Sequence, residues 1–216
     1  MKKYDTILFD LDGTLTDPGV GITNAVAYAL HQYGIIIEDK TILYPFIGPP
    51  LLDSFQKYYG FSDEKANRAI TYYREYYSKT GIFENVVYDG IKELLQNLKE
   101  HNKSLIVATS KPELFARQIL DHFGLSEYFR FIAGATMDGS LSRKGDIIKY
   151  ALNRCNITSV SSAIMIGDRE HDVIGAKKAG IDCIGVLFGY GTRTELEAAG
   201  ASYIAESVSD ILTYVI

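Results

Sequence analysis

The chain contains several short apolar runs that each end abruptly in polar residues or glycine, and this pattern constrains the fold more than any other feature. The runs are rich in β-branched residues and lie at residues 6–10, 104–109, 131–133, 163–166 and 183–188. They show no alternation between apolar and polar positions. Runs of this kind are typical of strands buried on both faces, as in a parallel sheet. The sequence therefore predicts a parallel sheet built from these segments.

Helical periodicity fills most of the intervals between the runs from residue 90 onward. Residues 91–98 carry isoleucine and leucine on one face of the expected helix. A helix is expected after Ser110, with Pro112 in its first turn. Near the end of the chain, Thr194 and Glu197 are expected to form a capping box. Strands that alternate with helices predict an α/β fold with a doubly wound parallel sheet of the Rossmann type.

Residues 17–85 do not follow this alternation. An apolar stripe with helical spacing runs from Ile22 to Tyr33, and two further helices are expected at residues 51–59 and 63–79. Three helices without an evident strand, placed directly after the first strand, indicate an inserted subdomain. We therefore predict an α/β core formed by residues 1–16 and 86–216, and a helical subdomain formed by residues 17–85.

Charge and composition exclude several classes of protein. The 22 Lys and Arg residues against 27 Asp and Glu residues give a net charge of −5, which disfavours binding to a nucleic-acid polymer or to an anionic membrane. The uncharged run at residues 18–37 predicts an amphipathic helix rather than a membrane span, because its apolar residues share one face. Acidic residues interrupt the segment that follows Met1-Lys2-Lys3, so no signal peptide is expected. We expect a cytoplasmic protein with Cys155 and Cys183 reduced, as a monomer by default and with a dimer as the alternative.

Polar side chains gather where the predicted strands end. In an open parallel sheet, ligands bind beyond the carboxyl ends of the strands. The residues at these ends, or within reach of them, are Asp10, Asp12, Ser110, Lys144, Asp168 and Asp172. The sequence therefore predicts several carboxylates, one hydroxyl and one ammonium group at a single edge of the sheet.

This set of groups fits the chemistry of phosphoryl transfer. Carboxylate oxygens select a hard divalent cation, and Mg²⁺ prefers a few carboxylates together with water and phosphate. The cation and Lys144 would neutralise charge on a phosphoryl group, and Ser110 would donate a hydrogen bond to it. Asp10 and Asp12 are separated by one residue, so their side chains leave the same face of an extended backbone. One of the pair is suited to be a nucleophile and the other a general acid and base.

The motifs DLDGT, TS, a later lysine and GDREHD occur in an order that resembles the haloacid dehalogenase-like (HAD) hydrolase superfamily. The resemblance covers the whole chain. The inserted helices look like the small cap of the subgroup that includes phosphoglycolate phosphatases, and the segment TSKPELFARQIL is similar to that subgroup. The segments GDREHDVIGAKKAGI and VLFGYGTRTEL look like relatives known as 5′-nucleotidases or phosphoglycolate phosphatases.

The resemblance implies roles for the four aspartates. Asp10 would be the nucleophile that becomes an aspartyl phosphate, and Asp12 would protonate the leaving alcohol and then activate water. Mg²⁺ would bind Asp10, the backbone carbonyl of Asp12, and Asp168. Asp172 would act behind the metal ligands or through a water molecule. The structural alternative is that Asp168 and Asp172 serve as the N-cap and first-turn acid of a helix.

The resemblance also implies contacts with the substrate. Ser110 and Lys144 would hold the phosphoryl oxygens, although Ser110 could instead cap the helix that contains Pro112. The other expected substrate contacts are Gly13, Thr14, Lys111 and Gly48, the last in a turn of the cap.

The sequence thus predicts a Mg²⁺-dependent phosphatase that acts on a small phosphomonoester, similar to a phosphoglycolate phosphatase or a 5′-nucleotidase. A phosphosugar mutase would use the same aspartyl phosphate and remains an alternative. A non-hydrolytic phosphoacceptor switch is a second alternative, although such a switch needs neither a lid nor the acid at Asp12.

Overall fold

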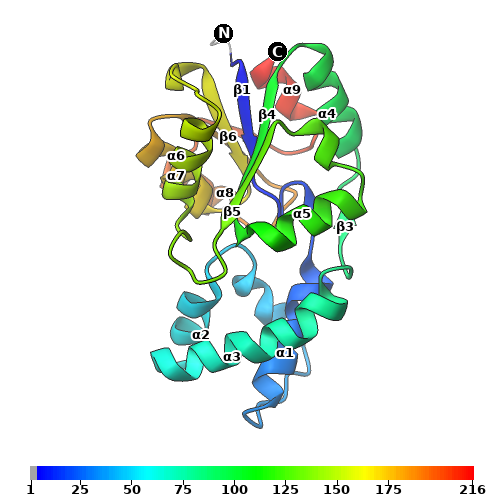
Figure 1. Ribbon diagram of the computed structural model, residues 1–216, viewed down its shortest axis with the longest axis vertical. Helices are drawn as coiled ribbons and strands as arrows, with labels where there is room; N and C mark the ends of the chain where they lie inside the picture. The colour runs from blue at the N-terminus through cyan, green and yellow to red at the C-terminus, as the bar shows by residue number, and fades with distance from the viewer. Residues whose placement is uncertain (1–3) are drawn as a thin grey trace. The chain divides into compact units, whose positions relative to one another are not determined.

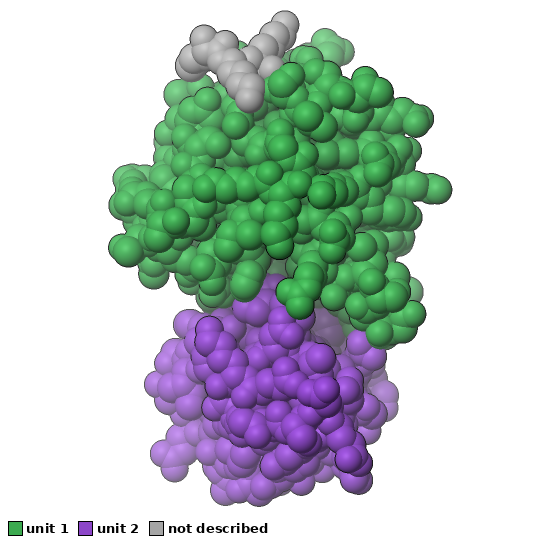
Figure 2. Space-filling view, turned by 90° about the vertical axis from the view of Figure 1, so that its left-hand side faces the viewer, with its two compact units in different colours: residues 1–16, 87–216 green, residues 17–86 purple. Residues whose placement is uncertain are grey.

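The computed structural model describes residues 4–216. The first three residues, which enter the argument against a signal peptide, lie outside the described residues. The chain forms two compact units, one of residues 1–16 and 87–216 and one of residues 17–86 (Figure 2). The strands β2 (Thr16–Asp17) and β3 (Val86–Val87) pair with each other where the chain passes between the units.

The first unit is built on a six-stranded parallel sheet with the order β5-β4-β1-β6-β7-β8. The strands are β1 (Thr6–Phe9), β4 (Ser104–Pro112), β5 (Phe131–Ala135), β6 (Ala163–Gly167), β7 (Asp182–Val186) and β8 (Tyr203–Ala205). Every residue of β1 and of β6 is buried, which explains why these runs show no polar alternation. The predicted α/β fold with a parallel sheet is confirmed.

Helices cover both faces of the sheet, with α6 and α7 on one side and α4 and α5 on the other (Figure 1). The helices of this unit are α4 (Ile91–Glu100), α5 (Glu113–His122), α6 (Lys144–Arg154), α7 (Glu170–Ala179), α8 (Arg193–Ala199) and α9 (Asp210–Val215), with short 3₁₀ turns η3 (Ser126–Tyr128) and η4 (Val160–Ser162). Leu8, Ile106 and Met165 of the central strands share one buried cluster with Ile148 of α6 and Val173 of α7. Full burial of such a side chain contributes about 1.5–3 kcal/mol, so this layer holds the strand ends in register.

Several predicted boundaries differ from the structure. Strand β4 continues to Pro112, which is the N-cap of α5 rather than a residue of its first turn. The last cap lies two residues earlier than predicted, since the Thr192 side chain accepts a hydrogen bond from the Glu195 backbone N–H at 3.1 Å. The strand β8 is absent from the prediction, because three residues are too few to show a pattern.

The second unit is helical. It contains α1 (Gly19–His31), the 3₁₀ helix η1 (Lys40–Phe46), α2 (Leu51–Tyr59), α3 (Asp63–Tyr76) and the π-helical turn η2 (Tyr77–Gly81). The helix predicted to end at residue 79 therefore ends at Tyr76 and continues as the π turn. Among residues 4–216, no helix combines the length and the apolar character needed to cross a membrane.

Candidate active site

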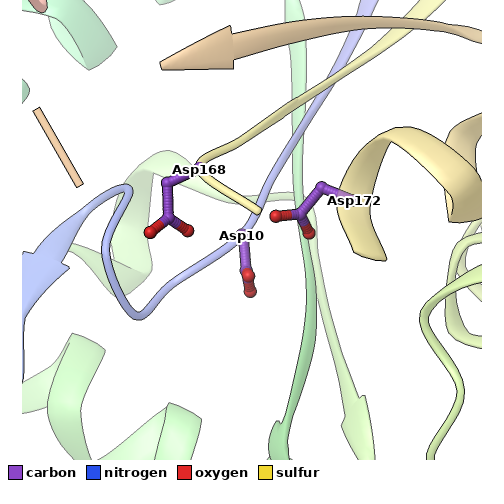
Figure 3. Close-up of side chains that lie close together, drawn as sticks. All are labelled: Asp10, Asp168 and Asp172. Atoms are coloured by element: carbon purple, nitrogen blue, oxygen red, sulfur yellow. The ribbon is translucent and has the colours of Figure 1, made fainter. Parts of the chain in front are cut away.

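Three of the aspartates singled out in the sequence converge at the carboxyl edge of the sheet. Asp10 follows β1, Asp168 follows β6, and Asp172 lies in the first turn of α7, so that one carboxylate oxygen of each lies within 4.8 Å of the others (Figure 3). The backbone N–H of Asp10 donates to the carbonyl oxygen of Ile166 at 2.9 Å, which ties the end of β1 to β6. The sheet register therefore brings these side chains together from sequence positions far apart.

Two glycines make this convergence possible. Gly13 has a φ of 79°, and a Cβ atom at this position would lie 2.2 Å from Oδ2 of Asp168. A Cβ atom at Gly167 would lie 2.2 Å from Cγ of Asp172. A larger residue at either position would displace a carboxylate, and a positive φ at position 13 also disfavours other residues.

Lys144 supplies a positive charge within the cluster. It is the first residue of α6, and its Nζ lies 2.7 Å from Oδ2 of Asp10 and 2.8 Å from Oδ1 of Asp172. The ammonium group also donates to the carbonyl oxygen of Ala108 at 3.2 Å. Burial alone would lower the pKa of Lys144, but the two carboxylates outweigh it and hold the pKa above its usual range. The structure thus brings Lys144 into contact with two of the carboxylates, Asp10 and Asp172.

Asp168 is the most buried carboxylate of the cluster, with none of its surface exposed. Its Oδ2 accepts a hydrogen bond from the backbone N–H of Tyr190 at 2.7 Å, whereas its Oδ1 has no hydrogen-bond partner among residues 4–216. Burial, and next the charge of Asp172, raise the pKa of Asp168 well above its usual value. A buried carboxylate oxygen without a partner is costly, so the site has the character of one that binds a cation.

The donor set fits a hard divalent metal ion. Asp10, Asp168 and Asp172 bring three buried carboxylates into one space, and Lys144 pairs with two of them. The oxygens on offer are those that Mg²⁺ and similar ions prefer. A divalent cation at this position would balance the remaining negative charge and give Asp168 Oδ1 a partner.

Asp12 lies beside this cluster but is paired with a different lysine. Its Oδ2 is 2.5 Å from Nζ of Lys111, and its Oδ1 has no hydrogen-bond partner in the described part of the chain. Burial raises the pKa of Asp12, and the ion pair with Lys111 opposes that rise. A raised pKa suits a group that must carry a proton, which agrees with the expected role of general acid.

The observed helix ends exclude two capping roles that were alternatives to a role in the site. Ser110 lies half-buried within β4, so it does not cap α5. Asp168 is not the N-cap of α7 either, because that residue is Arg169. Asp172 combines two contacts: its Oδ2 accepts from the backbone N–H of Arg169 at 3.1 Å, and its Oδ1 pairs with Lys144.

Two further predicted substrate contacts have different surroundings. Thr14 is fully buried, and its hydroxyl has no hydrogen-bond partner within residues 4–216. Gly48 lies in the second unit between η1 and α2, with a φ of 101°. The contacts of these residues with a substrate stay predictions.

The loop that follows β7 also contributes to the site, although none of its residues was predicted from the sequence. The backbone N–H of Tyr190 fixes Asp168, and a Cβ atom at Gly189 would lie 2.4 Å from Cβ of Asp168. Glu195 of α8 pairs with Arg169 at 2.8 Å and supports the start of α7. The segment Gly189-Tyr190-Gly191 follows a predicted parallel strand, so the rule that ligands bind at strand ends could have identified it.

Comparison with known proteins agrees with this geometry. The family model described as haloacid dehalogenase-like hydrolase matches residues 7–186. A 5′-nucleotidase of Pseudomonas aeruginosa is 46% identical over 196 residues, which cover 91% of this chain and 88% of that protein. The tyrosine-protein kinase PtkA of Mycobacterium tuberculosis is 37% identical over 203 residues, covering 94% of this chain and 69% of that protein.

Among solved structures, one from Clostridium acetobutylicum that is described as a predicted phosphatase superposes with a TM-score of 0.96 at 51% identity, covering 98% of each chain. The family match spans most of this chain, and the buried carboxylates lie where the family motifs predicted them. The chain therefore belongs to the haloacid dehalogenase-like hydrolases and is a phosphatase of that family.

Proposed function

We propose that the protein is a Mg²⁺-dependent phosphatase that hydrolyses a small phosphomonoester through an aspartyl phosphate on Asp10. The observation that carries this proposal is the cluster of three buried carboxylates around Lys144. This arrangement balances charge only in part and so favours a divalent cation together with an anionic substrate.

The metal would be held by Asp10 and Asp168, with the backbone carbonyl of Asp12 and with Asp172 in a supporting position. When bound, a divalent cation supplies positive charge against the phosphoryl oxygens. Asp168 is held for this task by the backbone N–H of Tyr190. Asp172 and Lys144 are held by each other.

Asp10 and Asp12 carry out the nucleophilic attack and the proton transfers. An oxygen of Asp10 forms a bond to phosphorus as the bond from phosphorus to the ester oxygen breaks, and Asp12 gives its proton to the departing oxygen. In the second step water attacks phosphorus, its proton goes to Asp12, and the bond from Asp10 to phosphorus breaks to release phosphate. The second step therefore returns Asp10 and Asp12 to their starting states.

The phosphoryl oxygens would be bound by Lys144 and Ser110, and by backbone N–H groups near Gly13. Lys144 already lies 2.7 Å from the carboxylate of Asp10, which places its charge beside the reacting group. Thr14 is a further candidate for substrate contact. Donors that are fixed before the reaction stabilise the transition state without reorganisation.

The leaving group would be selected by the helical cap, residues 17–85, with Gly48 as a candidate contact. The 46% identity to a 5′-nucleotidase supports nucleoside monophosphates as the first substrates to test. Phosphoglycolate and sugar phosphates follow, since fold alone does not fix the substrate. A monomer acting on a small phosphoester is the expected active species.

A phosphate-release assay tests this proposal. The panel contains nucleoside monophosphates, phosphoglycolate, hexose phosphates and phosphotyrosine, each with Mg²⁺ and with EDTA, and Asp10→Asn is the blank. We expect metal-dependent release that the blank lacks. Transfer of the phosphoryl group between sugar hydroxyls without release would identify a mutase, and stable phosphorylation of Asp10 without turnover would identify a phosphoacceptor switch.

A further inference from the structure

A second buried ion pair lies at the same edge of the sheet as the carboxylate cluster. Nζ of Lys111 lies 2.5 Å from Oδ2 of Asp12, and the two side chains are 5% and 10% exposed. The other carboxylate oxygen of Asp12, Oδ1, is buried and accepts no hydrogen bond from residues 4–216. The two oxygens of one carboxylate therefore have different surroundings.

The backbone around Lys111 is closely held. The N–H of Lys111 donates to the hydroxyl oxygen of Thr109 at 3.2 Å. Strand β5 approaches the same segment at Gly134, where a Cβ atom would lie 2.7 Å from the carbonyl oxygen of Lys111 and 2.6 Å from the backbone nitrogen of Glu113. The start of the Lys111 side chain is thus fixed by its own strand, β4, and by the neighbouring strand β5.

The backbone around Asp12 is also fixed. Asp12 forms an isolated β-bridge with Thr16, and the N–H of Gly13 donates to the carbonyl oxygen of Thr16 at 2.8 Å. Lys111 therefore joins two rigid segments that are 99 positions apart in sequence. A buried link of this kind determines how the carboxylate plane of Asp12 is turned.

We propose that Lys111 is a positioning residue that holds Oδ2 of Asp12 and leaves Oδ1 as the oxygen that gives and takes the proton. This inference rests on the proposed phosphatase function. An ammonium group only donates hydrogen bonds, so the oxygen that it contacts acts as an acceptor and the proton of the neutral acid resides on the other oxygen. As the ester bond breaks, the proton moves from Oδ1 to the departing oxygen, and in the second step Oδ1 receives the proton of water.

This role differs from the substrate contact that the sequence predicts for Lys111. A residue that binds the phosphoryl group increases the rate of hydrolysis of every ester by a similar factor. A residue that orients the general acid matters only where the departing oxygen needs a proton. The dependence of the rate on the leaving group therefore separates the two roles.

The experiment compares phenyl phosphate with 2,4-dinitrophenyl phosphate, with Mg²⁺ present. Phenolate is a poor leaving group that requires a proton, whereas 2,4-dinitrophenolate departs without one. The value of kcat/KM covers the steps up to formation of the aspartyl phosphate and excludes its hydrolysis, so the ratio of kcat/KM for the two esters reports the protonation of the leaving group. The variants are Lys111→Met, Asp12→Asn and the two combined.

Lys103→Met is the matched control. Lys103 is also a buried lysine of the first unit, but its Nζ donates to the carbonyl oxygen of Tyr4 at 2.7 Å, and it precedes β4. This control measures the effect of removing a buried ammonium group away from the carboxylates. We expect it to keep the wild-type ratio of kcat/KM for the two esters.

For Lys111→Met we expect kcat/KM for phenyl phosphate to fall by about 10²-fold or more, since positioned general acids contribute about 10²–10⁴-fold, with little change for the dinitrophenyl ester. A burst of dinitrophenolate is also expected, because the aspartyl phosphate then forms faster than it is hydrolysed. Adding Lys111→Met to Asp12→Asn should cause little further loss. The combined variant has no unpaired buried charge, so this comparison holds even if Lys111→Met alone folds poorly.

Equal losses for the two esters would overturn the inference, because they would assign Lys111 to phosphate binding or to the fold. An unchanged rate for phenyl phosphate would overturn it as well. Failure of the wild-type chain to release phosphate from any ester would instead contradict the proposed phosphatase function, and this outcome is distinct from the other two.

Discussion

Replacing Lys144 by methionine removes an ammonium group from between two buried carboxylates. Nζ of Lys144 lies 2.7 Å from Asp10 and 2.8 Å from Asp172, and the three side chains are 4%, 5% and 1% exposed. Methionine has a similar length but no charge, so the substitution leaves both carboxylates without their partner. Breaking a buried ion pair from one side costs about 3–5 kcal/mol, and we expect a loss of this size in the free energy of unfolding.

The assay is urea unfolding of the wild type and of Lys144→Met in EDTA. Saturating Mg²⁺ should then stabilise both proteins, since a ligand that binds only the folded state contributes about 2.7 kcal/mol at 100 times its Kd. The gain should be larger for Lys144→Met, because a divalent cation also replaces the missing positive charge. Combining Lys144→Met with Asp10→Asn should restore part of the lost free energy of unfolding, with a coupling energy of about 0.5–3 kcal/mol between the two substitutions.

A loss below about 1 kcal/mol in EDTA would refute this reasoning, because an exposed ion pair has that value and a buried one does not. Additive effects of Lys144→Met and Asp10→Asn would refute it too. Either result would mean that Lys144 does not neutralise the cluster.

Three further predictions follow from the same geometry. Gly13→Ala should abolish metal-dependent activity, because its Cβ would lie 2.2 Å from Asp168. Gly180→Ala is the control: Gly180 has a φ of 78°, but an added Cβ would meet no atom within 4 Å beyond its local chain neighbours, so the change should cost only about 1 kcal/mol in thermal unfolding. Burial raises the pKa of Asp172 to about 6, so its contribution to stability in EDTA is present below its ordinary value of 3.8 and is lost as pH rises toward 6. Unfolding of the wild type and Asp172→Asn from pH 4 to 7 checks this, and the stability of the wild type relative to the variant should fall over that range. Burial also raises the pKa of Cys183 well above its usual value, so peptide mapping should find it unlabelled by iodoacetamide at pH 7 until the protein unfolds; rapid labelling of the folded protein would contradict its burial.

Much of the fold could be predicted because strands that are buried on both faces consist almost entirely of apolar residues. The strands β1 and β6 are buried at every position, since helices cover both faces of the sheet, and Thr6 is their only polar side chain. The helix α2 has the predicted bounds, Leu51–Tyr59, and ends at Gly60 in a left-handed conformation. Short elements such as β8 carry too few residues to show periodicity.

The site could be predicted only as far as residue type and strand ends allow. The positions of Asp10 and Asp168 follow from the parallel register, because both directly follow paired strands. The hydrogen bond from Tyr190 to Asp168 uses a backbone N–H, which any residue but proline provides, so the side chain gives no signal. The pairing of Lys111 with Asp12 depends on the rotamers of two distant side chains, which no local pattern records.

Detection of an aspartyl phosphate on Asp10 is the decisive experiment for the proposed phosphatase mechanism. The Asp12→Asn variant should form this species on Asp10 from 2,4-dinitrophenyl phosphate and hydrolyse it slowly, because the group that activates water is lost. Acid quenching and peptide mass spectrometry should then find phosphate on the peptide that contains Asp10, in the presence of Mg²⁺ and not of EDTA. Phosphate on another residue, or turnover by Asp10→Asn, would contradict the account.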